Sequence, residues 1–311
     1  MKLLLICFLS LMPFYGLGQV TLEVQPALDI LDDFDKIRDF TMDTDGKESY
    51  FTIQSPNEEV SVIAKSIKID GVWVKPKIAS FSGKYKDLEP FLSPDGLRLY
   101  FVSNRPLDNA SSHPKDFDIW YVQRNSSKSN WSAPINLGAP INTEHNEFYP
   151  AVALNGNMYY TCDCPGALGR DDIFFSSYQN QSYSAPVSLG TGINTDGFEY
   201  NAFIAPDESY LIFGGYNRED GRGSGDLYIS FKEKDGDWGK ATPLPAPINS
   251  KYMDYCPFVD PKNDVLYFTS RRSQEPGTTM VSMEVLLDYL NSYENGGSRL
   301  YKTQFDIMSL K

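Results

Sequence analysis

The chain has 311 residues, of which 41% are hydrophobic and 22% charged, and its formal net charge at pH 7 is −13. This length is enough for one large folded domain or two smaller ones. Such an acidic balance repels phosphate groups, so it argues against nucleic acid and against an anionic lipid surface as partners. The acidity itself is typical of an exported protein that must stay in solution.

The first 18 residues have the pattern of a cleavable signal peptide. Lys2 precedes an uncharged apolar run over residues 3–14, and Gly16 and Gly18 place small side chains next to the expected cleavage point. The run is shorter than a membrane-spanning helix requires, and Cys7 lacks the small residues that precede a lipid-anchored cysteine. We therefore expect export to the periplasm or beyond, a mature chain that begins at Gln19, and no membrane insertion.

An internal repeat covers the rest of the chain. A hairpin turn occurs in all five units. An Asp-Ile or Asp-Leu pair before aromatic residues follows it in three of them, and an aromatic residue followed by Ile-Asn and an acid comes next in three, with a looser copy at Trp73. Successive turns lie 50 to 60 residues apart, at Asp45-Gly46, Asp95-Gly96, Asn155-Gly156, Asp207-Glu208 and Lys262-Asn263. Three landmarks that recur in a fixed order indicate one structural unit repeated five times.

Each unit is expected to form four short strands, which we call a, b, c and d in chain order. The runs are rich in Tyr, Phe, Val and Ile and are separated by tight turns, which is typical of antiparallel hairpins. The sequence therefore predicts an all-β fold, a five-bladed propeller of four-stranded antiparallel blades. The expected repeats are 37–86, 87–146, 147–198, 199–253 and 254–311. The last repeat ends before its strand d, so we expect Val20–Leu28 to supply that strand and close the ring.

Ser93–Arg105 reads Ser-Pro-Asp-Gly-Leu-Arg-Leu-Tyr-Phe-Val-Ser-Asn-Arg and is followed by Asp-Ile-Trp at Asp118. This pattern resembles the WD-like propeller repeats of the TolB family, which are common in exported bacterial proteins, those of the Bacteroidetes in particular. The resemblance covers essentially the whole mature chain. It implies a binding or scaffold protein of the cell envelope, and it implies no particular chemistry.

One face of the propeller is expected to carry the function. Strand direction alternates, so the b–c and d–a connections share a face, and the b–c connections are long and unlike one another. The acids that open strand a in four repeats and the arginines that follow strand b should also lie there. The candidate partner-binding residues are Asp87, Arg105, Glu147, Arg170, Glu199, Arg218, Asp254 and Arg271.

The recurring acids admit two interpretations. They could form a ring of carboxylates that binds a cation or a basic peptide, or each could be a brace between blades that accepts backbone hydrogen bonds. Recurrence in every repeat favours the brace, because catalysis needs residues that differ between blades. Five-bladed propellers also include glycosidases, and if the chain were such an enzyme, Glu147 and Glu199 would be the catalytic carboxylates.

Other candidate chemistry is sparse, and we expect no cofactor and no metal. His113 and His145, the only histidines, lie in different connections. Cys162-Asp163-Cys164 could bind a soft metal or form a small-ring disulfide, but zinc sites of this type usually need a second cysteine pair. Residues 43–46 could bind a structural Ca²⁺, although this segment aligns with an ordinary hairpin turn and lacks a closing glutamate.

One segment interrupts the repeat. Residues 278–293 in the fifth b–c connection have the apolar spacing of an amphipathic helix, which should end at residues 295–297. We expect its apolar face to pack on the propeller, with a partner-binding surface or a channel lid as the alternative; that face comprises Val281, Val285, Leu286, Tyr289, Leu290 and Tyr293. The sequence thus favours a monomeric binding protein for a protein or glycan partner, with a carbohydrate-active hydrolase or lyase as the alternative.

Overall fold

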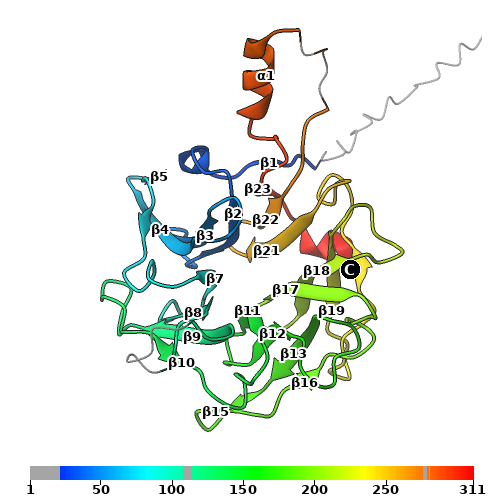
Figure 1. Ribbon diagram of the computed structural model, residues 1–311. Coiled ribbons are helices and arrows are strands. Elements are labelled where there is room, and N and C mark those ends of the chain that lie inside the picture. The colour runs from blue at the N-terminus through cyan, green and yellow to red at the C-terminus, as the bar shows by residue number, and fades with distance from the viewer. Residues whose placement is uncertain (1–21, 108–113, 276–278, 280) are drawn as a thin grey trace, which may run out of the picture.

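Five antiparallel sheets surround a common axis in the computed structural model, which describes residues 22–107, 114–275, 279 and 281–311 (Figure 1). The prediction of a five-bladed propeller is confirmed. The expected signal peptide and His113 lie outside the described residues.

Each blade runs from strand a near the axis to strand d at the rim. The first blade comprises β2 (Ile37–Met42), β3 (Glu48–Gln54), β4 (Ser61–Ile69) and β6 (Lys77–Ile78), with β5 (Val72–Trp73) beside β4. The second comprises β7 (Asp87–Leu92), β8 (Arg98–Ser103), β9 (Asp118–Gln123) and β10 (Ile135–Asn136). The third comprises β11 (Glu147–Val152), β12 (Met158–Cys162), β13 (Asp172–Ser176) and β16 (Val187–Ser188), with a small hairpin of β14 (Tyr178–Gln179) and β15 (Ser182–Tyr183).

The fourth and fifth blades complete the ring. The fourth comprises β17 (Phe198–Ile204), β18 (Tyr210–Tyr216), β19 (Asp226–Phe231) and β20 (Thr242–Pro243). The fifth comprises β21 (Asp254–Asp260), β22 (Val265–Ser270), β23 (Arg299–Gln304) and β1 (Gln25–Pro26). Two short 3-10 helices, at Asp29–Leu31 and Ile307–Leu310, lie outside the blades.

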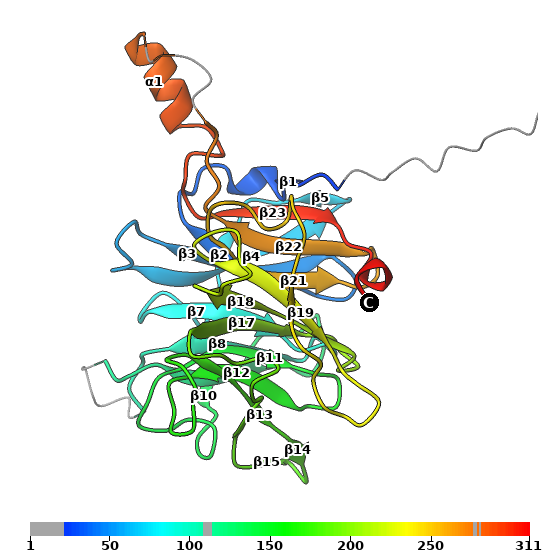
Figure 2. The same ribbon diagram turned by 90° about the vertical axis from the view of Figure 1, so that its right-hand side faces the viewer.

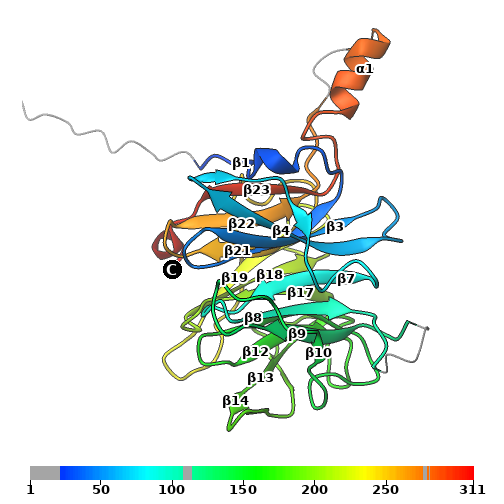
Figure 3. The same cartoon turned by 90° about the vertical axis from the view of Figure 1, so that its left-hand side faces the viewer.

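The N-terminal strand closes the ring, as expected. Gln25 pairs with Lys302 and Pro26 with Tyr301, in the position that strand d occupies in the other blades. The Ala27 amide donates to the Leu300 carbonyl at 3.0 Å, and Leu31 is buried in the core below. First and last blade are therefore held together by the pairing of β1 and β23, which Figures 2 and 3 show from two sides.

Alternation along the strands places large side chains between the blades. Phe51, Phe101, Phe213 and Phe268 occupy equivalent positions on strand b of four blades, and all four are fully buried. Burial of apolar surface, which contributes about 25 cal/mol per Å², is the main stabilising contribution in such a fold. Hydrophobic packing between neighbouring blades thus fixes the position of every strand a around the axis.

The inserted helix differs from the expectation. It spans Met283–Leu290 and is capped by Ser282, whose side chain accepts the Val285 amide. The helix projects away from the propeller in all three views (Figures 1 to 3), and none of its residues is buried. Tyr293 of the predicted apolar face, which follows the helix, contacts Tyr301 of the propeller, but the prediction is wrong for the helix itself. It contacts its own connection instead, where the Tyr289 hydroxyl lies 3.0 Å from Ser273 Oγ.

Within the described part of the chain, no helix is long and apolar enough to cross a membrane.

Candidate functional site

The four acids that open strand a are buried and hydrogen-bonded. Asp87, Glu147, Glu199 and Asp254 are 0% exposed, and each accepts hydrogen bonds from the connection that brings the chain in from the preceding blade. Asp87 binds Ser82 Oγ at 2.8 Å, and Asp254 accepts the Ser250 amide at 2.6 Å. These four side chains have the geometry of a brace between blades.

Arginines complete three of these braces. Arg105 lies 2.5 Å from Asp87 and also donates to the Phe81 carbonyl, and Arg218 donates to Glu199 at 3.3 Å and to the Ile193 carbonyl. In the fifth blade the acid binds Arg272 at 3.0 Å. The neighbouring Arg271, not Arg272, was the residue predicted to bind a partner on this face.

The other two candidate arginines are exposed. Arg271 lies over the Tyr255 ring at 5.8 Å, and Arg170 lies over Phe198 at 6.0 Å. Of the eight expected partner-binding residues, six are therefore buried in braces, and only these two are accessible to a partner.

The hypothesis that Glu147 and Glu199 are channel carboxylates does not fit their positions. Both side chains are fully buried, and Thr143 and Thr195 donate to them through both the amide and the hydroxyl. A glycosidase needs carboxylates that reach a sugar on opposite sides of the scissile bond. Other residues line the axis of this propeller.

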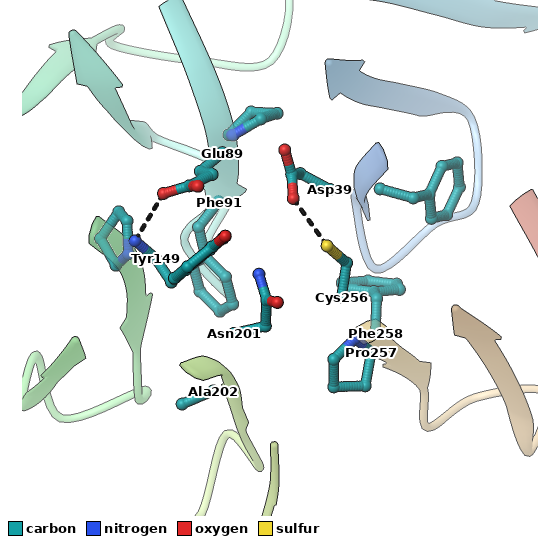
Figure 4. A pocket seen from close by; sticks show the side chains of 12 residues that line it. Asp39, Glu89, Phe91, Tyr149, Asn201, Ala202, Cys256, Pro257 and Phe258 are labelled. Atoms are coloured by element: carbon teal, nitrogen blue, oxygen red, sulfur yellow. Dashed lines mark hydrogen bonds between the residues drawn. The ribbon is translucent and has the colours of Figure 1, made fainter. Parts of the chain in front are cut away.

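A ring of five different side chains surrounds the axis. Asp39, Glu89, Tyr149, Asn201 and Cys256 occupy the same position on strand a of the five blades and converge in Figure 4. Each residue has a left-handed backbone conformation, with φ between 50° and 60°, and each lies at a β-bulge where the register with strand b shifts. A bulge turns one side chain out of the sheet alternation. Non-glycine residues in this conformation cost about 1–3 kcal/mol each and are concentrated at functional sites.

Arg38 joins one side of this axial ring. Its Nε lies 3.0 Å from Asp39 Oδ1, its terminal nitrogen donates to Glu89 Oε1 at 3.1 Å, and it also donates to the Tyr149 hydroxyl. Cys256 donates from its thiol to Asp39 Oδ1 at 2.8 Å, and the Tyr149 amide donates to Glu89 at 2.7 Å. Carboxyl groups from two blades are thus linked through one guanidinium.

Burial controls the ionisation of this cluster. Loss of hydration raises the pKa of Glu89 to about 8, although Arg38 opposes the shift. Burial also raises the pKa of the Cys256 thiol well above its ordinary value, and the neighbouring Asp39 carboxylate adds to that shift. Glu89 therefore carries its proton at neutral pH, and Cys256 remains a thiol.

Little space is left at the axis. The cavity between these side chains amounts to about 40 Å³. Pockets for small ligands usually measure about 300–1,000 Å³, whereas a few waters fit here. In this conformation the axis accommodates no sugar ring.

Analysis of the sequence missed the axial ring, although the repeat contains a signal for it. This position on strand a differs in every repeat, while the residue after it is proline in three of the five. Arg38 is a second exception, since the other blades have apolar or aromatic residues at its position: Leu88, Phe148, Tyr200 and Tyr255.

A larger cleft lies at the rim, between the first and second blades. It measures about 690 Å³ and is lined by Trp131, by the exposed Ile78 and by Lys65 and Lys77, among others. Trp131 is held in place because its indole N–H donates to the Tyr50 hydroxyl at 2.7 Å. An aromatic wall with lysines beside it could bind a sugar or an acidic group.

The exposed side of α1 is the largest departure from the repeat. Met283, Leu287 and Leu290 are 68%, 50% and 51% exposed, and their i, i+4, i+7 spacing places them on one side of the helix. Glu284 and Asp288 form an acidic stripe four residues apart.

The remaining candidates have ordinary surroundings. In the turn at residues 43–46, Asp43 accepts the amides of Lys47 and Glu48, which is how a hairpin turn uses an aspartate. His145 lies 3.8 Å from Asp163 at the surface. Cys162 and Cys164 form a disulfide, and Cys256 is free. Binding of Ca²⁺ and the monomeric state remain predictions.

Comparison with known proteins shows the fold. No protein-family model matches the sequence, and no curated protein matches it. A glycoside hydrolase structure has a TM-score of 0.56 at 9% identity and covers 89% of each chain. The α-L-arabinofuranosidase PaAbf62A from Podospora anserina, solved with cellotriose, has a TM-score of 0.52 at 12% identity and covers 87% of this chain and 90% of its own.

A TolB-like protein from Agrobacterium tumefaciens has a TM-score of 0.48 at 14% identity and covers 76% of this chain and 70% of its own. At 9% and 12% identity, the similarity to the two hydrolase structures is one of fold and leaves the activity open. Membership of the TolB family itself stays a prediction.

Proposed function

We propose that this chain is a non-enzymatic binding protein of the cell envelope that holds a protein partner through α1 on the b–c face of the propeller. The observation that carries this proposal is the exposed apolar side of α1, formed by Met283, Leu287 and Leu290. Three large apolar side chains at this spacing are the pattern by which a helix enters a groove of another protein. A lone exposed leucine would need no explanation, but a row of three on a projecting helix does.

The partner should offer an apolar groove with basic residues along one edge. Glu284 and Asp288 flank the apolar side, and the chain as a whole carries a formal charge of −13. Opposite charges at the rim of an interface favour encounter and fix the orientation of the complex. A glycan would instead need aromatic faces and hydrogen-bond donors, which the side of α1 does not offer.

The helix is held ready for binding. Ser282 caps its first turn, the Tyr289 hydroxyl binds Ser273 and Gln274, and Asn295 donates to the Leu290 carbonyl at 2.8 Å. An eight-residue helix is marginal in isolation. Because these contacts already order it, less conformational entropy is lost when a partner binds.

The test compares matched variants in a pull-down from an envelope extract of the source cells. One variant carries Met283→Ser, Leu287→Ser and Leu290→Ser, and the control carries Trp131→Ala in the rim cleft. We expect a protein that the unaltered chain and the control retain and the triple variant loses. The captured protein is then purified, and calorimetry of the binary complex should show at least a tenfold weaker dissociation constant for the triple variant.

Two outcomes would contradict the proposal. Capture that is insensitive to the triple variant would exclude α1 as the binding surface. Loss of capture by the Trp131→Ala variant, and not by the triple variant, would assign recognition to the rim cleft. Binding of the chain to an oligosaccharide array would then identify the ligand as a glycan.

A glycoside hydrolase is the second candidate, and one observation favours it. Asp39 and Glu89 come from neighbouring blades and face the same small space at the axis, on a fold that known glycoside hydrolases share. Two carboxyl groups in different surroundings, one of them with a raised pKa, are what an acid and base pair requires. Against it, Arg38 binds both groups, and the cavity has no room for a sugar.

A direct assay distinguishes the two candidates. Chromogenic glycosides, α-L-arabinofuranosides among them, are incubated with the chain and with Asp39→Asn and Glu89→Gln. We expect no turnover above buffer. Turnover that both substitutions abolish would establish the hydrolase and replace our proposal.

A further inference from the structure

One of the braces between blades has lost its arginine. In the second and fifth blades, the opening acid faces a serine across the a–b pair, Asp87 opposite Ser103 and Asp254 opposite Ser270. Each serine donates to its acid, at 2.7 Å and 2.6 Å, and an arginine two residues further along neutralises the charge. A buried carboxylate therefore has both a hydroxyl donor and a cation.

The third blade has sulfur at both positions. Glu147 pairs across the strands with Cys162, which occupies the position of the serine, and Cys164 occupies that of the arginine. Cys162 Sγ lies 3.8 Å and Cys164 Sγ 4.0 Å from Glu147 Oε1. Both cysteines are buried, and in this structure they are joined by a disulfide.

Glu147 is consequently left without a cation. Thr143 still donates to Oε1, but Oε2 is buried with no hydrogen-bond partner. Among the described residues, no lysine or arginine lies within ion-pair distance of this carboxylate, whereas Asp87, Glu199 and Asp254 each have an arginine. Burial raises the pKa of Glu147 to about 7, as expected for a carboxyl without a counter-ion.

We propose that Cys162, Cys164 and Glu147 form a redox-controlled site for a thiophilic divalent cation such as Zn²⁺, in which the ion takes the place of the missing guanidinium. The three potential ligand atoms already lie within 4.8 Å of one another. Zinc binds thiolates at about 2.3 Å and carboxylates at about 2.0–2.2 Å, so a sulfur and an oxygen on one ion are about 3.5 Å apart. The observed separations need only a small adjustment once the sulfurs part. Water supplies the fourth ligand.

Access to the site is controlled by the disulfide. A dithiol reductant transfers two electrons and two protons, so that the Cys162–Cys164 bond breaks, two thiols form, and the reductant becomes a disulfide. Binding of the ion then releases the two thiol protons, because thiolates are the ligands. In the oxidised chain neither sulfur can become a thiolate, and neutral disulfide sulfurs bind metal ions poorly, so the site is closed. The third blade thus exchanges a permanent brace for one that depends on redox state and metal.

The test uses Co²⁺ as the probe for the divalent ion. The purified chain is reduced with dithiothreitol, freed of reductant under argon and titrated, with the oxidised chain as control. We expect about one Co²⁺ per reduced chain, with thiolate-to-cobalt charge-transfer absorption, and none in the oxidised chain. Zn²⁺ should displace Co²⁺, and mass spectrometry of the desalted protein should then find one zinc per chain.

The repeat itself supplies the matched variant. Cys162→Ser with Cys164→Arg recreates the brace of the second blade, so it should fold and bind no Co²⁺ in either redox state. Cys256→Ala should still bind one ion, because the thiol at the axis is not a ligand. Glu147→Gln should keep the charge-transfer absorption and weaken binding at least tenfold.

Thermal unfolding followed by circular dichroism separates folding from binding. Zn²⁺ should raise the Tm of the reduced chain by several degrees and leave the Tm of the restored-brace variant unchanged. A reduced chain that stays folded without binding Co²⁺ overturns the proposal. So does a reduced chain that unfolds whether or not Zn²⁺ is present, and so does ion binding by the restored-brace variant.

Discussion

Two positions of the innermost strands lie only two residues apart and behave in opposite ways. The first position holds the opening acid in four blades, and each acid makes nearly the same hydrogen bonds. The second holds the axial ring, where five blades present five different side chains. Braces recur because four of the five blades are joined to the preceding chain in the same way. Side chains at the axis do not join blades and are free to differ. The axial position therefore holds residues that distinguish this protein from a regular repeat.

Removal of one brace should give the largest change in stability. Arg105→Met leaves the fully buried Asp87 without its cation, and breaking a buried ion pair by one partner costs about 3–5 kcal/mol. Urea unfolding should show this loss in the free energy of unfolding. The control, Arg170→Met, alters an exposed arginine and should stay within about 0.5 kcal/mol. Equal effects of the two substitutions would contradict the brace.

The axial ring should make stability depend on pH. Burial raises the pKa of Glu89 from an ordinary 4.5 to about 8. Below pH 4.5 the carboxyl is protonated in both states, so the stability it contributes is fully present. Between 4.5 and about 8 the unfolded chain gives up this proton while the folded chain retains it. The free energy of unfolding therefore falls as pH rises through this window, by at most about 1.4 kcal/mol per pH unit, and levels off above it.

Glu89→Gln isolates this contribution. Burial also raises the pKa of Glu199 and Asp254, so the unaltered chain has a slope of the same sign from other acids. Urea unfolding at several pH values should show a shallower decline between pH 4.5 and 8 for the variant. Parallel curves would mean that Glu89 is ionised in the folded chain.

Substitution of two buried asparagines, one near a brace and one in the axial ring, allows the two regions to be compared directly. Asn249 binds the amide and carbonyl of Leu227 and the carbonyl of Leu244, whereas the Oδ1 of Asn201 in the axial ring has no partner. Asn249→Ala leaves buried backbone groups unpaired and should cost about 2–3 kcal/mol. Asn201→Ala should cost less than about 1 kcal/mol in the same urea titration. A reversed order would show that the axial ring, too, is primarily structural.

The sequence was informative about the blades and uninformative about the axis, for physical reasons. Turn residues and alternating strands are local signals, so five blades and the closing role of Val20–Leu28 could be predicted. The axial ring depends on a bulge and a left-handed residue in each strand a, and neither follows from the types of Asp39 or Glu89. Arg272 was missed although it aligns with Arg105, since each follows by two residues the serine that faces the opening acid.

The inserted helix shows a different limit. Its apolar spacing was visible in the sequence. Amphipathicity shows that a helix face is apolar, but it does not identify the surface against which that face packs. Predicting where α1 lies would have required contacts that no local pattern reveals, such as that of Tyr289 with Ser273.

The smallest effect on stability is expected at α1. Its size shows whether the apolar side of the helix is packed within the chain. Met283→Ser, Leu287→Ser and Leu290→Ser together should change the free energy of unfolding by less than about 0.5 kcal/mol, because these side chains are already half or more exposed. Tyr293→Ala is the matched control, since this half-buried ring contacts Tyr301 and its hydroxyl donates to the Leu300 carbonyl at 2.6 Å. It should cost about 2–3 kcal/mol. If the triple variant were as destabilised as the control, its apolar side would be packed within the chain in solution, and the helix would be structural in the same sense as the braces.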